Sequence, residues 1–369
     1  MRKNRFLVSV LAVILGFITG AIVMLITGHN PAQAYRALLK GAGFIVTVSK
    51  DATWKDIVFN QRFGDTLLNM TTLILTGLSV AFAFRTGLFN IGVSGQMLMG
   101  GFFGSVIGVK LALPSYIHVP LAVIAAVIGG ALWAILPGIL KAKYRIHEVV
   151  TTIMMNYIAV WTVYYFVPLI MRGSFDTESK IINPSASLRT KGLTEFFHGS
   201  NVNIGLFIAL AAVVFVWWLL EKTTFGYELK SVGFNINASK YAGMKVNKNM
   251  VYSMMIAGAL AGLAGATFYL GYADNMKIGT LPSQGIDGIA VALLGLNAPV
   301  GVLLSAFLFG IMNAGSLFMN SATDVPNELV SIIVAIIIYF AATSLMLESW
   351  LNRIRKIFKK NEGEKNVVE

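Results

Sequence analysis

The sequence predicts an all-α integral membrane protein of about ten transmembrane helices, because it is strongly hydrophobic and poor in charge. Of its 369 residues, 56% are hydrophobic and 12% are charged, and the mean hydropathy is +0.72. A soluble domain draws about a quarter of its residues from Asp, Glu, Lys and Arg. Half that density leaves too little charge to cover a surface in water, so most of the chain must face lipid or other helices.

Ten apolar stretches approach the roughly 20 residues that a helix needs to cross a bilayer. The first, 6–27, follows basic residues and could be a signal peptide, but it exceeds a typical h-region and lacks a clean cleavage pattern; we interpret it as a retained helix. The uncharged run 289–323 is too long for one crossing, and the turn signal Asn297-Ala298-Pro299 divides it. The predicted segments are 6–27, 67–84, 86–109, 111–140, 149–171, 202–220, 249–273, 284–296, 300–320 and 329–347.

The basic residues assign the two sides of the membrane. Ten crossings place both termini on one side, and the loops on that side carry most of the 29 Lys and Arg residues. The positive-inside rule makes that side cytoplasmic. The net charge of +12 has the same origin. Nucleic-acid binding is not expected, because the basic residues flank apolar segments and form no single patch.

The same topology predicts the organisation of the chain. A transmembrane permease domain spans 1–350 and a basic cytoplasmic tail spans 351–369. Two long polar segments, 29–64 and 172–202, are expected outside the cell. The segment 222–248 is the longest on the cytoplasmic side.

Motifs for catalysis and for metal binding are missing from the sequence. Cysteine is absent, which excludes disulfides, thiolate metal sites and a cysteine nucleophile. The pair His147-Glu148 resembles the start of HExxH, but position 151 is Thr. The sequence has no GxxxxGK[ST] phosphate loop, and nothing pairs a nucleophile with a base. We therefore expect no catalytic residue, metal or cofactor in this chain. Energy for transport must come from another subunit, unless the chain conducts passively.

The first informative stretch is 84–96, FRTGLFNIGVSGQ, between two predicted helices. Its three glycines disfavour regular helix, at about 1 kcal/mol each relative to alanine. Asn90, Ser94 and Gln96 bring polar groups to membrane depth, where such groups usually face a cavity or another helix. Transporters often break helices near the midplane to hold substrate. Alternatively, the glycines serve only close helix packing.

The second stretch is 226–244, GYELKSVGFNINASKYAGM, on the cytoplasmic side. It mixes apolar and polar residues and is longer than the roughly 2–8 residues of an ordinary helix connection. A short helix at the membrane surface that docks a partner explains the excess. The alternative is an interfacial helix without a partner.

The third stretch, 285–301, begins GIDGIAVALLG and places Asp287 close to membrane depth. An acid there is a functional candidate; it could equally be a structural acid at the start of a helix. The stretches 84–96 and 285–301 hold matching places in predicted segments 2–5 and 7–10, which hints at an internal duplication.

Together the three stretches resemble the permeases of ABC importers of the branched-chain amino acid, ribose and simple-sugar type. The resemblance covers roughly 65–345 and is closest to nucleoside importer permeases that work with a receptor lipoprotein. It implies a ten-helix fold with two inverted halves, helices 2–5 and 7–10, in a bacterial plasma membrane. It also implies three partners: ATPase subunits that carry ATP and magnesium and bind 226–244, a second permease, and an extracytoplasmic solute-binding lipoprotein. Many relatives carry Glu where this chain has Ser94, so an acid-dependent role is in doubt there.

The resemblance further implies alternating access driven by ATP on the partner subunits, with a nucleoside as the expected solute. Ribose, simple sugars and branched-chain amino acids stay open, as does a secondary transporter or channel suggested by the intramembrane acid; a membrane enzyme is a remoter hypothesis. A nucleoside joins an apolar base to a hydroxylated ribose, so aromatic and amide side chains should line the pathway. The expected pathway residues are Phe89, Asn90, Gln96, Asn156 and Asp287. The expected ATPase contacts are Tyr227, Glu228, Asn235 and Tyr241.

Overall fold

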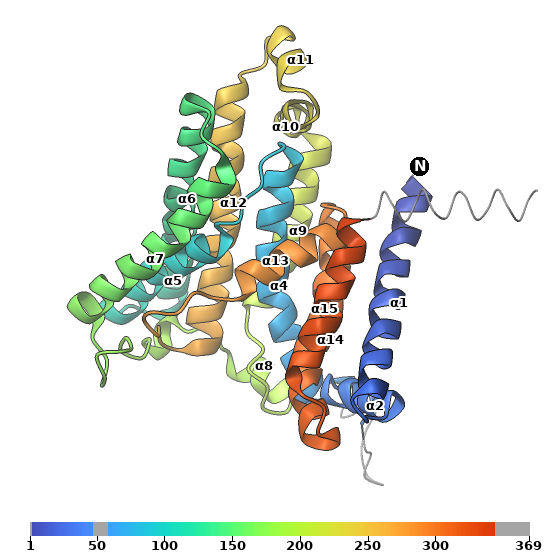
Figure 1. Cartoon of the computed structure of the whole chain (residues 1–369). Helices are drawn as coiled ribbons and strands as arrows, with labels where there is room; N and C mark the ends of the chain where they lie inside the picture. The colour runs from blue at the N-terminus through green and yellow to red at the C-terminus, as the bar shows by residue number, and fades with distance from the viewer. Residues whose placement is uncertain (1, 47–57, 344–369) are drawn as a thin grey trace, which may run out of the picture. The chain divides into compact units, whose positions relative to one another are not determined.

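The computed structural model describes residues 2–46 and 58–343 (Figure 1). The predicted tail, 351–369, lies outside this range. The predicted permease domain comprises two compact units: one contains the two ends of the chain, described over 2–35 and 319–343, and the other is Arg36–Phe318. Within the described residues the only extended pairings are two isolated β-bridges, so the predicted all-α class is confirmed.

The described helices account for all ten predicted membrane segments. Seven of them are long and apolar enough to cross a membrane: α1, α4, α6, α7, α9, α12 together with η2, and α14. The helices are α1 (Arg2–Ile26), α2 (Pro31–Gly41), α4 (Gln61–Arg85), α5 (Val93–Lys110), α6 (Ser115–Tyr144), α7 (Glu148–Met171), α8 (Lys191–Phe196), α9 (Gly205–Lys222), α10 (Thr224–Phe234), α11 (Ile236–Tyr241), α12 (Val246–Phe268), α13 (Gln284–Leu294), α14 (Pro299–Thr323) and α15 (Asn327–Ala342), with the 3-10 turn η1 (Pro184–Ala186) and the π-helical turn η2 (Tyr269–Ala273).

Three details differ from the prediction. Helix α5 begins at Val93 instead of 86, because the preceding residues form a loop in which Gly87 has φ of 74°. The expected single helix in 226–244 is two helices, α10 and α11, because Asn235 adopts an extended conformation and its side chain caps α11. Helix α2 is an addition, because it lies within the segment 29–64, for which the sequence analysis predicted a polar surface and named no helix.

The unit that contains the chain ends is built on a close contact between α1 and α15. Gly16 and Gly20 face Ile337 and Ile333, and a Cβ on either glycine would lie within 2.5 Å of the isoleucine side chain. Small residues at such positions let membrane helices approach closely. The Tyr35 hydroxyl donates a hydrogen bond of 2.6 Å to the carbonyl oxygen of Phe17 in the same unit.

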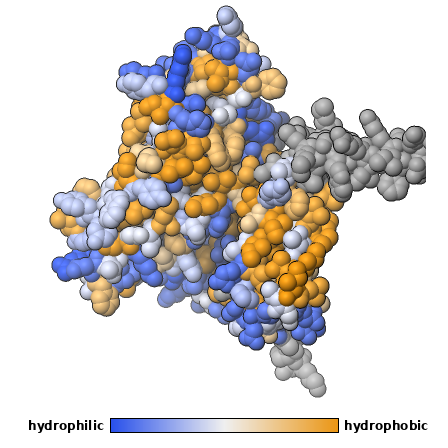
Figure 2. Space-filling view, in the orientation of Figure 1, coloured by the Kyte–Doolittle hydropathy of each residue, from blue (hydrophilic) through white to orange (hydrophobic). Residues whose placement is uncertain are grey.

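The second unit is centred on α12, which packs against α4, α5 and α6. Glycines on α6 and α12 bring the two backbones into contact: a Cβ on Gly130 would lie 2.3 Å from the carbonyl oxygen of Gly258. The outer face of α6 instead exposes Ile124, Ile128 and Leu132, one helical turn apart. Figure 2 shows hydrophobic residues over much of the visible face, as expected of a surface that faces lipid.

The helix pairings of this unit repeat. The first predicted half consists of α4, α5, α6 and α7, and the second of α12, α13, α14 and α15. The first helix of each half packs against the second helix of the other half, α4 on α13 and α12 on α5. It also packs against the third helix of the other half, α12 on α6 and α4 on α14, the latter through Gly310 and Gly77. The two first helices, α4 and α12, lie side by side (Figure 1). This exchange of partners is the arrangement that two related, interlocked halves produce.

Substitution of Gly130 by valine is expected to destabilise the helix core, because the added side chain would clash with the backbone of α12 at Gly258. Overpacking costs about 1–3 kcal/mol, occasionally more. We expect the midpoint of thermal unfolding in detergent to fall by about 5 °C or more. Gly192→Val on α8 is the matched control, since a Cβ there meets nothing within 4 Å. Equal unfolding midpoints for the two variants would contradict the packing argument.

Candidate functional site

The loop between α4 and α5 is held by side-chain amides. Asn90 and Gln96 are fully buried and pair through two hydrogen bonds, of 2.9 and 3.1 Å. The Asn90 Oδ1 also accepts a hydrogen bond of 3.1 Å from the backbone N–H of Gly92. The contact with Gly92 satisfies a backbone group where the helix is interrupted, and the Asn90–Gln96 pair satisfies the buried amides themselves.

Asn156 of α7 fixes the start of α5 from the other side. Its Oδ1 accepts a hydrogen bond of 2.8 Å from the backbone N–H of Gly95, and its Nδ2 donates one of 3.0 Å to the carbonyl oxygen of Ile91. The structure therefore brings three of the five predicted pathway residues together, in what we call the amide cluster: Asn90, Gln96 and Asn156. Its polar groups are engaged with one another and with the backbone, which is the work of a structural clamp; a role as pathway lining stays a prediction.

Replacement of Asn156 by leucine tests the clamp. The substitution leaves the N–H of Gly95 and the C=O of Ile91 without their partner. Each unsatisfied group lowers the free energy of unfolding by about 1–3 kcal/mol where it is buried. We expect a clear fall in the unfolding midpoint, whether or not nucleosides are present. Asn247→Leu, at an exposed position in the first turn of α12, should leave the midpoint unchanged. If Asn156→Leu keeps its stability and loses only transport, the residue is a pathway residue and not a clamp.

Phe89 lies apart from the amide cluster's hydrogen bonds. It is half-buried, and its ring centroid lies 4.9 Å from that of Phe84 on the last turn of α4. The role of Phe89 in the pathway stays a prediction.

The second Gly-rich stretch meets the first. A Cβ on Gly285, in the first turn of α13, would lie 2.3 Å from Oγ of Ser94 in the first turn of α5. Arg85 Nε donates a hydrogen bond of 2.9 Å to the carbonyl oxygen of Asn297, in the loop that ends α13. The two stretches that occupy matching places in the sequence are therefore in contact at both of their ends.

Asp287 occupies the first turn of α13. It is half-buried, and within the described part of the chain its carboxylate takes part in neither a hydrogen bond nor an ion pair. Its neighbours on the helix are tightly packed, since Gly288 lies against Thr76 of α4 as Gly285 lies against Ser94. Ser94 is fully buried and its Oγ also has no hydrogen-bond partner among the described residues. The carboxylate of Asp287 is thus a charge that has no partner among the described residues of α13 and its neighbouring helices. The structure records no hydrogen bond between Asp287 and the amide cluster.

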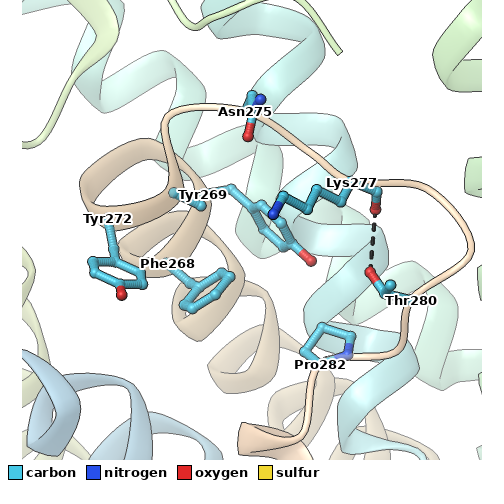
Figure 3. A pocket seen from close by; sticks show the side chains of 8 residues that line it. Phe268, Tyr269, Tyr272, Asn275, Lys277, Thr280 and Pro282 are labelled. Carbon is cyan, nitrogen blue, oxygen red and sulfur yellow. Dashed lines mark hydrogen bonds between the residues drawn. The ribbon is translucent and has the colours of Figure 1, made fainter. Parts of the chain in front are cut away.

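A cavity of about 460 Å³ opens at the end of α12 (Figure 3). It is lined by aromatic rings from the last turn of α12 and from η2, and by polar residues of the loop that leads to α13. The sequence analysis assigned this region to an ordinary membrane helix and missed it. The available signal was three aromatic residues within five positions, followed by a polar loop: Phe268, Tyr269, Tyr272, Asn275, Lys277 and Thr280.

Helices α10 and α11 expose aromatic side chains on the predicted cytoplasmic side. Tyr227 is 64% exposed and Tyr241 is 94% exposed. Phe234, which the sequence analysis did not single out, is also 94% exposed. Aromatic side chains are enriched in protein interfaces, so these three are candidates for contact with a partner.

The other two predicted ATPase contacts act within the chain. Glu228 accepts a hydrogen bond of 2.7 Å from Nδ2 of Asn249, which joins α10 to α12. Asn235 is exposed, and its Oδ1 accepts a hydrogen bond of 3.0 Å from the N–H of Ala238 at the start of α11. These contacts hold the two helices in place and leave Asn235 accessible.

Helix α10 also touches the loop that precedes α5. A Cβ on Gly233 would lie 2.3 Å from the carbonyl oxygen of Arg85 and 2.9 Å from the backbone nitrogen of Gly87. Helix α10 and the Gly-rich stretch 84–96 are therefore in direct backbone contact. In the described residues, no three His, Asp or Glu side chains lie close enough together to hold a metal ion.

Comparison with known proteins identifies the family of this chain. Guanosine ABC transporter permease protein NupP of Bacillus subtilis is 44% identical over 358 residues, which cover 96% of this chain and 98% of that protein. Nucleoside ABC transporter permease protein NupB of Lactococcus lactis is 36% identical over 375 residues, covering 100% and 99%. Glucose ABC transporter permease protein TsgB13 of Haloferax volcanii is 30% identical over 344 residues, covering 91% and 86%. Residues 63–342 match the family of branched-chain amino acid transport system permease components. The chain belongs to this family of ABC transporter permeases.

Proposed function

We propose that the chain forms half of the pathway through which an ABC importer moves a nucleoside, most favourably a purine nucleoside, across a bacterial plasma membrane. The observation that carries the proposal is similarity over the whole chain to a guanosine permease and to a nucleoside permease, at 44% and 36% identity. The three motifs of the sequence and the missing phosphate loop agree with it. ATP and magnesium bind to separate ATPase subunits, and this chain supplies contacts that differ between two states of the membrane helices.

Helices α10 and α11 are the surface that meets an ATPase subunit. The outward side chains of Phe234 and Tyr241 are suited to enter a pocket on that partner, since aromatic residues dominate the energetics of protein interfaces. Closure of the ATPase pair on ATP displaces α10. The backbone contact of Gly233 with Arg85 and Gly87 then transmits this displacement to the loop in front of α5.

The predicted sides of the membrane indicate where the solute-binding lipoprotein meets the chain, and a second permease is the other remaining partner. Both termini and α10–α11 face the cytoplasm, so the segment 172–202 and the cavity at the end of α12 face outward. A solute-binding lipoprotein delivers the nucleoside to this outer face. A second permease, a homologue or a second copy of this chain, completes the pathway.

Within the pathway, Asp287 and Phe89 contact the solute and the amide cluster maintains the break in the helix. A carboxylate is an acceptor for hydroxyl groups, and a ribose offers two adjacent hydroxyls. An aromatic ring offers a face for the base. The two side chains thus match the two parts of a nucleoside.

The proposal is tested by reconstitution in liposomes. Complexes that contain this chain, its ATPase subunits, the second permease and the binding lipoprotein should accumulate labelled guanosine only when ATP is present. Unlabelled purine nucleosides should compete, whereas ribose, glucose and leucine should not. Competition by the sugars instead would favour a sugar permease. Accumulation by this chain alone would favour a secondary transporter or channel and would overturn the proposal.

A further inference from the structure

We infer that the cavity at the outer end of α12 is a nucleoside-binding site, in which the base lies against Phe268 and Tyr272 while polar groups of the following loop meet its edge or the ribose. The inference rests on the proposed function and adds a location to it. The volume of about 460 Å³ falls within the 300–1,000 Å³ of sites for small molecules.

The aromatic side chains provide the apolar wall. The ring centroids of Phe268 and Tyr272 lie 5.5 Å apart, and Tyr272 is 47% exposed, so the pair presents ring surface to a solute (Figure 3). The ring of Tyr269 is buried and packs against Gly101 of α5, so closely that a Cβ on Gly101 would clash with the ring. Aromatic side chains can stack on any base, because every base has a π-face.

The polar side of the cavity comes from the loop between η2 and α13. Asn275 donates a hydrogen bond of 3.0 Å from its Nδ2 to Glu178, which leaves its Oδ1 as an acceptor. Lys277 is exposed, and among the described residues it has no ion pair. Its ammonium group can donate to guanine, whose O6 and N7 are acceptors. One acceptor and one donor beside an aromatic wall suit an uncharged nucleoside.

The loop is held in place from outside. The backbone N–H of Ser179 donates a hydrogen bond of 2.8 Å to the carbonyl oxygen of Met276, and the N–H of Ile278 donates one of 3.0 Å to that of Thr177. Arg189 forms an ion pair of 2.8 Å with Asp274 and donates from Nε to the carbonyl oxygen of Gly271. A wall fixed in this way needs little ordering when a ligand binds.

The loop that lines the cavity runs directly into α13. Its last lining residue, Pro282, is followed directly by the first turn of α13, which carries Asp287. The helical turn that carries the carboxylate of Asp287 therefore follows the cavity lining in the sequence. This order suits an outer site that a solute occupies before it passes between α4, α5 and α13.

The test is equilibrium binding of labelled guanosine to the assembled permease–ATPase complex in lipid nanodiscs, without ATP and without the binding lipoprotein. We expect Phe268→Leu and Tyr272→Leu each to weaken binding roughly 5- to 150-fold, the range for loss of one stacked ring. Tyr157→Leu on α7, at a tyrosine that is 61% exposed, is the matched control and should bind as wild type. Unlabelled ribose should not compete, and guanosine monophosphate should compete no better than guanosine.

Photolabelling with an azido-guanosine supplies a second readout that does not depend on how well a variant folds. The label should map to residues 268–282 in the wild-type complex. Labelling elsewhere, unchanged binding by both variants, or no saturable binding at all would each overturn the inference. ATP-driven guanosine uptake by the complete system is measured in parallel. If uptake is present but the cavity takes no label, the location fails and the proposed function stands; if no nucleoside is taken up, the proposed function itself fails.

Discussion

Replacement of Phe234 and Tyr241 by aspartate is expected to abolish ATP-driven uptake while leaving the membrane helices intact. Both side chains are 94% exposed, so their removal costs the isolated chain little packing. In the complex they would be buried in the ATPase, where loss of an aromatic anchor costs about 2 kcal/mol or more. That corresponds to at least about 30-fold weaker association for each position. An aspartate adds the cost of burying a charge.

The measurement is co-purification of the ATPase subunits with each variant, together with uptake in liposomes. Tyr116→Asp is the matched control, since this tyrosine is 77% exposed at the start of α6, on the predicted outer side. Its variant should retain the ATPase and transport normally. Retention of the ATPase by the double variant Phe234→Asp, Tyr241→Asp would show that α10 and α11 do not form the docking surface.

Hydropathy sufficed to locate the membrane helices because it reflects a large transfer energy, whereas the side assigned from the charges stays a prediction. Each crossing needs roughly 20 apolar residues, and flanking Lys and Arg report the side. Hydropathy and flanking charge say little about the residue at which a helix begins inside the membrane. Helix α5 starts at Val93 because the amides of Asn90 and Asn156 bind backbone groups of residues 91–95.

The contents of the candidate site were only partly predictable for a related reason. The sequence identified Asn90 and Gln96 as polar groups at membrane depth and named them, with Asn156, as expected pathway residues. It could not show that they satisfy one another and the backbone, because Asn156 and Gly95 are separated by 61 positions. Partner choice across that separation is a property of helix packing, not of local pattern.

Two further features depend on local geometry that composition does not encode. The cavity at the end of α12 forms where the helix changes to the π-helical turn η2, which shifts the direction of the following side chains. The exposure of Phe234 depends on the interruption at Asn235, which separates α10 from α11. If 226–244 formed one regular helix, Phe234 would be predicted to lie on its apolar face.

Replacement of Asp287 by leucine is expected to lower nucleoside uptake strongly without lowering stability. A half-buried carboxylate that lacks a hydrogen bond and an ion pair within the described residues stabilises the fold little; it gains only from the positive end of the α13 dipole. A charge at membrane depth is costly and is usually retained for function. Leucine removes that cost, so the unfolding midpoint should stay constant or rise.

The loss of uptake has a definite expected size. A hydrogen bond to a charged group contributes about 1.5–3 kcal/mol, so loss of one contact with a ribose hydroxyl should reduce uptake roughly 10- to 150-fold. Asp287→Asn keeps an acceptor oxygen and removes the charge, and it should fall between leucine and wild type. The control is Glu195→Leu, at an exposed acid on α8, which should change neither property.

The pairing of the two measurements separates the two explanations that the sequence left open for Asp287. If the acid is structural, Asp287→Leu lowers the unfolding midpoint, and uptake falls only in proportion to the folded protein that remains. If it meets the solute, uptake falls while the midpoint does not. The packing of Gly285 on Ser94 and of Gly288 on Thr76 favours the second outcome, because the helix that carries Asp287 is already fixed by contacts in which the carboxylate takes no part.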